Sequence, residues 1–423
     1  MDKIRQLRCV ECGAVYRYGE VEYTCPTCGV SGILDVEFDY DAIAAAGFGK
    51  AALAAREDQS IWRYFELLPI ERKASVPTLY LGKTPIYRFP KLGQEIGIRE
   101  LLVKDDGRLP TGSFKDRASA IAVTRARELG FQEIACASTG NAASSLAGMA
   151  ANVGLNAHIF VPATAPESKV AQLMIFGADV LLVDGSYDQA YWLCMDAAKE
   201  FGWFNRNCAV NPYLVEGKKT CGLEIGEQLS RDMPEWVAVS VGDGCTIAGV
   251  WKGLKEMHRF GVLERLPRIL GVQAAGANPL TRAFQNGSSH PLPQDAVTLA
   301  DSIAVGEPRN GVKALRAVRE SGGVMVDVTD DAILDAMSLL AGRAGVFGEP
   351  AGVAALAGIR LAVQQGIIAR SDRALHIVTG NGLKDASAAF KVVDKPDCIP
   401  VSLDAVRAHV TRQTAVGVHA GEA

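Results

Sequence analysis

Short apolar segments alternate with amphipathic ones along most of this 423-residue chain, and this alternation limits the possible folds more than any other feature. Such a pattern favours parallel sheets covered by helices on both faces. The expected strands lie at 79–81, 86–88, 101–104, 132–137, 156–161, 179–183, 236–241, 268–274 and 374–379. The expected helices lie at 116–129, 141–153, 167–176, 187–200, 246–260, 311–319, 329–342 and 351–364. We therefore expect an α/β protein with two open twisted-sheet domains, whose ligands bind between them at the carboxyl ends of the strands.

The chain is longer than a single hydrophobic core usually supports, so we expect several structural units. These are an N-terminal unit at 1–38, a large α/β domain formed by 39–125 and 236–398, a smaller inserted α/β domain at 126–235, and a tail at 399–423. Residues 41–56 have the pattern of a helix, and 277–307 that of a long surface excursion. The tail is expected to be a weak helix with an irregular end.

Charge and composition exclude some functions. A formal net charge of −4 gives a field that repels phosphate backbones, so nucleic acid is not an expected partner. The N-terminus lacks the apolar core of a signal peptide, and no apolar run reaches the roughly 18 residues of a membrane span. We expect a cytoplasmic protein with a small-molecule substrate and no membrane partner.

Two cysteine pairs near the N-terminus have the spacing of a metal site. Cys9 and Cys12 form one C-x2-C pair, Cys25 and Cys28 form another, and a glycine follows each pair. Four thiolates so spaced are typical of a tetrahedral zinc ribbon, and a unit of fewer than 40 residues needs such a staple to fold. Free or disulfide-bonded cysteines are the alternative. We expect a structural Zn²⁺ ion.

Lys115 follows a Thr-Gly-Ser turn and begins a helix-forming run, within the segment PTGSFKDR at 110–117. The positive end of a helix dipole disfavours an ammonium charge, so an amine placed there is easier to deprotonate and more nucleophilic. Such a lysine suits covalent catalysis on a carbonyl group. Taken alone, the turn is equally compatible with a structural role and a solvated lysine.

A second strand-to-helix junction carries Ser138, Thr139, Gly140 and Asn141. Hydroxyls, an amide and free N–H groups at a helix start suit an anionic ligand group, although a plain N-cap has the same residues. In the functional interpretation, Asn141 donates to a ring oxygen and the loop holds a substrate carboxylate.

Two further junctions complete the set. Residues Gly242, Asp243, Gly244, Cys245 and Thr246 follow an apolar strand, and glycines there let backbone N–H groups form a nest for phosphate. A tight structural turn is the alternative. Because a carboxylate repels phosphate, we expect the Asp243 side chain to point away.

Thr379 ends the last strand, where its hydroxyl suits a heteroaromatic nitrogen unless the segment is only a glycine-rich turn. The dinucleotide and nucleoside-triphosphate fingerprints are both missing from the sequence. A reactive lysine, a ring-oxygen amide, a phosphate nest and a ring-nitrogen hydroxyl together match pyridoxal 5'-phosphate, which would act as an electron sink.

These motifs resemble those of the fold-type II pyridoxal-phosphate enzymes of the tryptophan synthase β-like fold, and among them the zinc-ribbon-bearing threonine synthase family. The similarity covers residues 5–395. It implies that Lys115 holds the cofactor, that Asn141 and the 138–140 loop meet the ring oxygen and the substrate, and that Thr379 faces the pyridine nitrogen. It also implies a homodimer.

The resemblance further implies a lyase that converts O-phospho-L-homoserine and water to L-threonine and phosphate, with Lys115 as the proton carrier. Ser113, Arg117 and Lys219 are then candidates for binding the substrate phosphate. The chain departs from the family pattern at Lys83, Leu109, Ala118 and Asp243. Leu109 and Asp243 leave open a β-replacement or β-elimination on a phosphorylated or hydroxylated amino acid, as in cysteate synthase-like or dehydratase-like enzymes.

Overall fold

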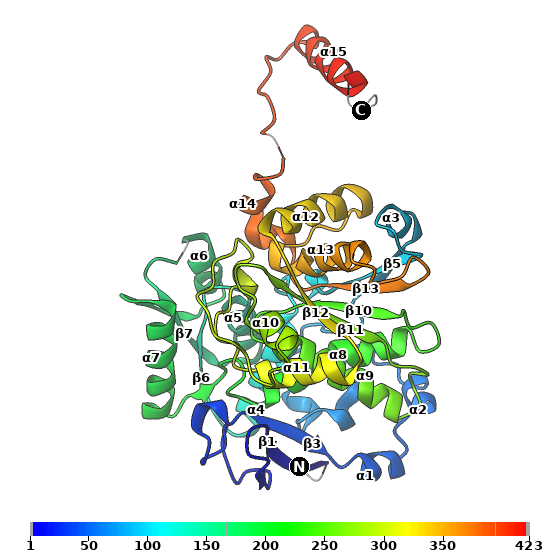
Figure 1. Cartoon of the computed structure of the whole chain (residues 1–423). Coiled ribbons are helices and arrows are strands. Elements are labelled where there is room, and N and C mark those ends of the chain that lie inside the picture. The colour runs from blue at the N-terminus through cyan, green and yellow to red at the C-terminus, as the bar shows by residue number, and fades with distance from the viewer. Residues whose placement is uncertain (1–2, 166, 394, 420–423) are drawn as a thin grey trace.

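The computed structural model describes residues 3–165, 167–393 and 395–419, and its strands form three sheets (Figure 1). The N-terminal sheet is antiparallel, with the order β2-β1-β3. Its strands are β1 (Ile4–Cys9), β2 (Val15–Tyr16) and β3 (Leu34–Phe38). Two short helices, α1 (Tyr40–Ala45) and α2 (Lys50–Ala54), and a 3₁₀ segment at Ile61–Leu67 connect it to the rest of the chain.

The largest sheet has six strands in the order β12-β11-β10-β13-β5-β4, all parallel except that β4 pairs antiparallel with β5. The strands are β4 (Ile86–Phe89), β5 (Glu100–Asp105), β10 (Trp236–Ser240), β11 (Arg268–Ala274), β12 (Val324–Val328) and β13 (Arg373–Val378). The five parallel strands are mostly buried, as expected for strands with helices on both faces, whereas no residue of the edge strand β4 is buried. The carboxyl ends of β5, β10 and β13 therefore meet at one edge.

The third sheet is parallel, with the order β8-β7-β6-β9. It contains β6 (Glu133–Ala137), β7 (Asn156–Pro162), β8 (Asp179–Val183) and β9 (Phe204–Asn205), with α5 (Asn141–Val153), α6 (Glu167–Ile175) and α7 (Tyr187–Glu200) around it. All of these elements fall within the expected inserted domain at 126–235. The domain boundaries themselves stay a prediction.

Helices cover the large sheet on both sides. On one side α13 (Pro350–Gln364) packs over β10, β11 and β13, and α12 (Asp330–Ala344) packs on α13. The other helices are α3 (Pro90–Glu95), α4 (Lys115–Glu128), α8 (Tyr213–Gln228), α9 (Cys245–Arg259), α10 (Pro279–Gln285), α11 (Gly311–Glu320), α14 (Ala386–Ala389) and α15 (Leu403–His419). Figure 1 shows α15 standing away from the rest of the molecule.

Several sequence expectations were wrong. The single helix at 41–56 is two helices, because Gly47 adopts a left-handed conformation with φ of 89° and ends the first. Residues 79–81 form no strand. The excursion at 277–307 contains α10, whose residues Leu280 and Ala283 are buried in the core. The tail is helical to His419, beyond the irregular end expected there, and 420–423 lie outside the described residues.

The sequence expectations missed the strands of the N-terminal sheet, helix α14 and four elements of the α/β body. These four are α3, β9, β12 and the 16-residue helix α8. Helix α8 is buried around its whole circumference from Tyr213 to Gly226, charged residues included, so it has no polar face to produce a helical period. Among the described residues, no helix is long and apolar enough to cross a membrane.

Candidate active site

Lys115 is the first residue of α4, and the turn before it is fixed against the end of β13. The Phe114 N–H donates to the Thr379 carbonyl at 2.9 Å, and the Asn381 N–H donates to the Gly112 carbonyl at 2.9 Å. Asp116 closes the turn by accepting the Thr111 N–H at 2.7 Å. The lysine junction and the Thr379 junction, which lie far apart in the sequence, are thus one structural unit.

The pKa of Lys115, at the start of α4, is lowered. Burial is the largest contribution, and the nearby ammonium of Lys218 is the next. Both disfavour the charged amine, whereas Glu349 acts in the opposite direction. The amine is therefore closer to the neutral, nucleophilic form than an exposed lysine would be.

The Asn141 junction faces an acid that the sequence analysis missed. The Asn141 Nδ2 donates to Glu349 Oε1 at 2.6 Å and to Ser302 Oγ at 3.4 Å. Burial raises the pKa of Glu349 to about 7, against the opposing effects of Asn141 and Lys115. A carboxyl group with that pKa exchanges a proton near neutrality, which is typical of functional sites. Glu349 precedes Pro350 at the start of α13, where an acid looks like an ordinary helix-start residue in the sequence.

The 242–246 loop has the geometry of an anion nest. Gly244 has φ of 89°, and a Cβ there would lie 2.8 Å from the Asn310 carbonyl oxygen, so only glycine fits. Helix α9 begins at Cys245. The Asp243 carboxylate accepts a hydrogen bond from the Arg309 N–H at 2.8 Å. Burial raises the pKa of Asp243 to about 6, which weakens the repulsion that a carboxylate would exert on phosphate.

At the Asn141 junction, beside Glu349, lies a cleft of about 440 Å³. Thr139, Gly140 and Asn141 line it, with Ser144, Lys169, Gln172, Asp301, Ser302, Glu349, Pro350, Ala351, Lys384 and Asp385. Ser138 lies directly before these residues, and its Oγ accepts the Gly140 N–H at 3.2 Å. Ser113 is buried in the lysine turn, where its Oγ lies 3.4 Å from the Lys115 backbone nitrogen.

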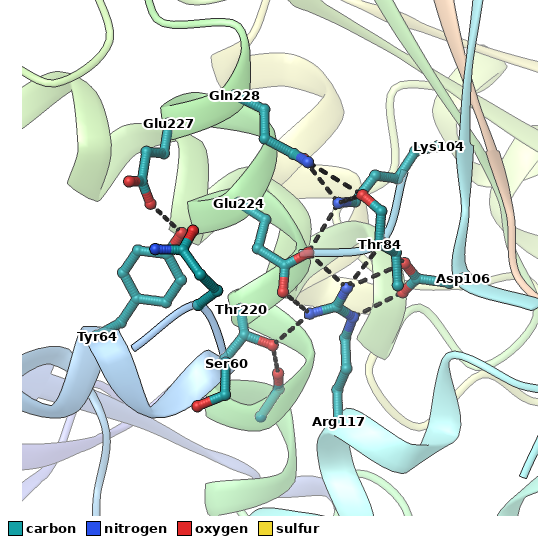
Figure 2. Close-up of polar contacts among 12 residues, drawn as sticks. Ser60, Tyr64, Thr84, Lys104, Asp106, Arg117, Thr220, Glu224, Glu227 and Gln228 are labelled. Atoms are coloured by element: carbon teal, nitrogen blue, oxygen red, sulfur yellow. Dashed lines mark hydrogen bonds and ion pairs between the residues drawn. The ribbon is translucent and has the colours of Figure 1, made fainter. Parts of the chain in front are cut away.

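Arg117 does not reach this cleft. Figure 2 shows its guanidinium group between Asp106 and Glu224, which it contacts at 2.6 and 2.7 Å. Lys104 binds the same Glu224 at 2.7 Å, and Thr84 and Thr220 complete the cluster. We call Lys104, Asp106, Arg117 and Glu224 the ion-pair cluster. Since its two cations face two anions, Arg117 has no charge left to bind a substrate phosphate.

Lys219 is also absent from the cleft. Its ammonium is buried between Glu216 and Glu256, at 2.5 and 3.0 Å. The structure therefore does not bring together the expected phosphate-binding set of Ser113, Arg117 and Lys219. The cations at the cleft are instead Lys169, which pairs with Asp301 at 2.6 Å, and Lys384, which donates to Ser144 Oγ at 3.1 Å.

The residues around Lys115 fit pyridoxal phosphate. A buried amine with a lowered pKa lies between an amide junction, a glycine-rich nest and the Thr379 turn. The backbone of Asn310 packs on the nest, and its buried side-chain amide has no hydrogen-bond partner in the part of the chain that the structure describes. An unpaired buried amide is costly, and a bound ligand can satisfy it.

The sulfur atoms of Cys9, Cys12, Cys25 and Cys28 lie within 4.8 Å of one another. Gly13 and Gly29 have positive φ values and form the tight turns after each pair. The Tyr16 hydroxyl contacts Cys25 Sγ at 3.0 Å. Four converging thiols are a donor set that suits Zn²⁺, with one neighbouring hydroxyl to support a ligand.

Comparison with known proteins shows the enzyme class to which the chain belongs. Residues 77–380 match the pyridoxal-phosphate dependent enzyme family, and the chain belongs to it as a lyase of fold type II. The fold agrees, since the processed threonine deaminase isoform 2 of Solanum lycopersicum matches with a TM-score of 0.65 at 24% identity, over 79% of this chain and 92% of that one.

Within this class the chain belongs to the threonine synthase family. The threonine synthase of Methanocaldococcus jannaschii is 40% identical over 95% of this chain and 98% of its own length. That of Methanosarcina acetivorans is 39% identical over 95% of this chain and 97% of its own length.

Proposed function

We propose that this protein converts O-phospho-L-homoserine and water to L-threonine and phosphate. The observation that carries the proposal is the combination of Lys115 with a cleft that holds two cations, Lys169 and Lys384, in a chain 40% identical to a threonine synthase. A substrate with both a carboxylate and a phosphate needs two anion sites besides the one for the cofactor.

In this proposal Lys115 binds pyridoxal phosphate covalently, the loop of Gly242, Asp243, Gly244, Cys245 and Thr246 holds its phosphate, Asn141 meets its ring oxygen, and Thr379 faces its ring nitrogen. When bound, the cofactor supplies a ring that takes up the electrons left by a departing proton. The loop of Ser138, Thr139 and Gly140 binds the substrate carboxylate at the start of α5, with the Thr139 N–H, which is free among the described residues, and the hydroxyl groups as donors.

Lys115 is also the group that would move protons at the bound substrate. Burial and the Lys218 charge favour the neutral amine, which can take a proton from one substrate carbon and return it to another. The carboxyl group of Glu349, which accepts a hydrogen bond from Asn141 at 2.6 Å, is a second group near Lys115 that can exchange protons.

The substrate phosphate is assigned to the Lys384 end of the cleft. The Lys384 ammonium donates to the Thr111 carbonyl at 3.0 Å and to Ser144 Oγ, so it is fixed by neutral groups, and no acid of the described residues forms an ion pair with it. Lys169 lies at the same cleft, and its partner Asp301 is more than half exposed. A phosphate can therefore compete for both cations.

Two further proposals concern the protein outside the cleft. Cys9, Cys12, Cys25 and Cys28 bind one structural Zn²⁺ ion, which holds the N-terminal sheet together. The protein acts as a cytoplasmic homodimer, in keeping with the resemblance of its motifs to those of its family.

The test is to incubate the purified protein with O-phospho-L-homoserine and to measure phosphate and threonine together. We expect equal amounts of the two products, and a much lower rate with Lys384→Met. Phosphate without threonine would reject the proposal and favour an elimination.

A further inference from the structure

Helix α8 carries two adjacent buried lysines whose surroundings differ. Lys219 binds two carboxylates, Glu216 and Glu256. Lys218 is equally buried, but among the residues that the structure describes its ammonium has one hydrogen-bond partner, the sulfur of Cys208 at 3.0 Å. An ammonium offers three donors, and sulfur is a weak acceptor. Besides the Cys208 sulfur, whose thiol has a pKa lowered well below its ordinary value, the ammonium keeps donors for a further anion.

The packing of α8 on α9 places Lys218 beside the nest. Gly249 of α9 has no side chain, and a Cβ there would lie 2.9 Å from the Cβ of Lys218. This close approach brings Lys218 near the start of α9. The Sγ of Cys208 lies 3.4 Å from the Sγ of Cys245, which is the first residue of α9 and part of the 242–246 loop.

Charges around Lys218 point to the same anion. After the larger effect of burial, its ammonium and the guanidinium of Arg206 both lower the pKa of Lys115, whereas Cys208 and Glu349 raise it, so two cations lie close to the lysine. The carboxyl group of Asp243 lies within 4.8 Å of both cysteine sulfurs, but its pKa of about 6 and its bond from Arg309 reduce its influence. A phosphate dianion at the nest would balance this positive charge.

The nature of Cys208 explains how Lys218 stays available. A carboxylate partner, as at Lys219, has little tendency to take up a proton at neutral pH. The Cys245 thiol and the charge of Lys218 hold the pKa of the Cys208 thiol well below its ordinary value, against the effect of burial, and a phosphate dianion nearby would raise it again. Cys208 can therefore take up a proton when a phosphate arrives and leave the ammonium free to bind it. Glutamate at that position would compete with the phosphate.

We propose that Lys218 binds the phosphate group of pyridoxal phosphate, as a charged complement to the backbone N–H groups of the 242–246 loop. The inference rests on the cofactor site described above, and not on which amino acid is the substrate. It assigns a role to a residue that the sequence analysis passed over in favour of its neighbour Lys219.

The test compares two ligands that differ only in the phosphate. The full-length protein, freed of cofactor, is titrated with pyridoxal phosphate and with pyridoxal for the wild type and for Lys218→Gln. We expect Lys218→Gln to weaken pyridoxal phosphate binding at least about tenfold, because a charge-assisted hydrogen bond is lost, and to change pyridoxal binding by less than about twofold. Lys218→Arg should restore most of the difference.

Lys219→Gln is the matched control, since it removes a neighbouring buried lysine from the same helix. The two carboxylates that Lys219 binds have other partners, so they stay paired in this variant. Lys252 binds Glu216 at 2.6 Å, and the Tyr40 hydroxyl donates to Glu256 at 2.8 Å. Lys219→Gln should leave the ratio of the two affinities unchanged. Cys208→Ala is a second variant for the case that Lys218→Gln does not fold, and it should keep or tighten pyridoxal phosphate binding.

Three results would overturn the inference. They are an unchanged affinity ratio in Lys218→Gln, an equal loss for both ligands, or a loss of pyridoxal phosphate affinity in Cys208→Ala. A wild-type protein that bound neither ligand would contradict the cofactor site itself. An assay that showed no threonine would leave these affinities untouched and would contradict only the proposed substrate.

Discussion

Lys115 and Arg117 are two residues apart at the start of α4, yet they belong to regions with opposite electrostatic character. In the ion-pair cluster, two cations face two anions, and Arg117 and Lys104 hold the pKa of Glu224 at about 2 although burial alone would raise it (Figure 2). At the Lys115 site, burial lowers the pKa of the amine, and among the described residues Lys218 has the Cys208 sulfur as its partner in place of a carboxylate. Buried cations that are paired with buried carboxylates stabilise the fold. Buried cations without a carboxylate partner indicate a place where a ligand can supply the negative charge.

The largest expected effect is on the unmatched side. Replacing Lys115 with alanine should reduce activity by at least about 10²–10⁴, because the proton carrier and the cofactor attachment are both lost. Stability should not fall, since the change removes a buried amine that has no acid bonded to it in the described structure. Steady-state kinetics and urea unfolding of the same preparation check both statements. A Lys115→Ala protein that was both active and destabilised would contradict the functional role of Lys115 and indicate a structural one.

In the ion-pair cluster, a substitution should mainly reduce stability. Arg117→Met leaves Asp106 and Glu224 short of a buried partner and should cost about 3–5 kcal/mol of unfolding free energy. The surface pair of Arg231 and Glu264 provides a control, since Arg231→Met removes an exposed ion pair and should change stability little. Equal urea midpoints for the two variants would show that the cluster is not a structural support.

The four N-terminal cysteines form a third kind of cluster, whose charges we expect a metal ion to match. The wild type should contain about one zinc per chain by elemental analysis, and Cys12→Ala should lose most of it. The N-terminal sheet should then become sensitive to protease, while Lys115 keeps its cofactor. Full zinc content and unchanged protease resistance in Cys12→Ala would argue against a structural ion.

The smallest effect concerns pH. The pKa of Glu349 is raised by burial from 4.5 to about 7, so between these values the folded chain holds a proton that the unfolded chain releases. Stability should therefore fall as the pH rises through this range, by on the order of 3 kcal/mol. Glu349→Gln keeps an acceptor for Asn141 and should flatten the slope. Part of the pH dependence should remain in this variant, because the pKa of Asp243 is also raised, to about 6. Identical pH slopes in wild type and variant would contradict the buried acid.

Much of the fold could be predicted because most strands and helices here have one clear period. The bounds of α5, β8, α7 and β11 agree with the expected ranges to the residue. Helix α8 could not be found in this way, because its surroundings bury polar and apolar residues alike. For the same reason, the sequence led us to select Lys219 rather than Lys218 as a candidate site residue. Adjacent helical residues point in directions about 100° apart, and an all-buried helix gives no sign of which direction faces the ligand.

Glu349 and the role of Arg117 were hidden for a different reason. Their partners lie far away in the sequence: Asn141 is 208 residues from Glu349, and Glu224 is 107 residues from Arg117. No local pattern reports such pairs. The four junctions were visible because parallel strands bring their carboxyl ends together, so that unusual residues after several strands imply a shared site.

The most direct test of the assignment is to find the lysine that holds the cofactor. Borohydride reduces the carbon–nitrogen double bond between a lysine and the aldehyde to a stable single bond, and mass spectrometry of the digested protein then locates the adduct. We predict that the adduct lies on the peptide that contains Lys115, and that Lys218, the other buried lysine at the site, remains unmodified. An adduct on Lys218, or none on the Lys115 peptide of a protein that binds pyridoxal phosphate, would contradict the account.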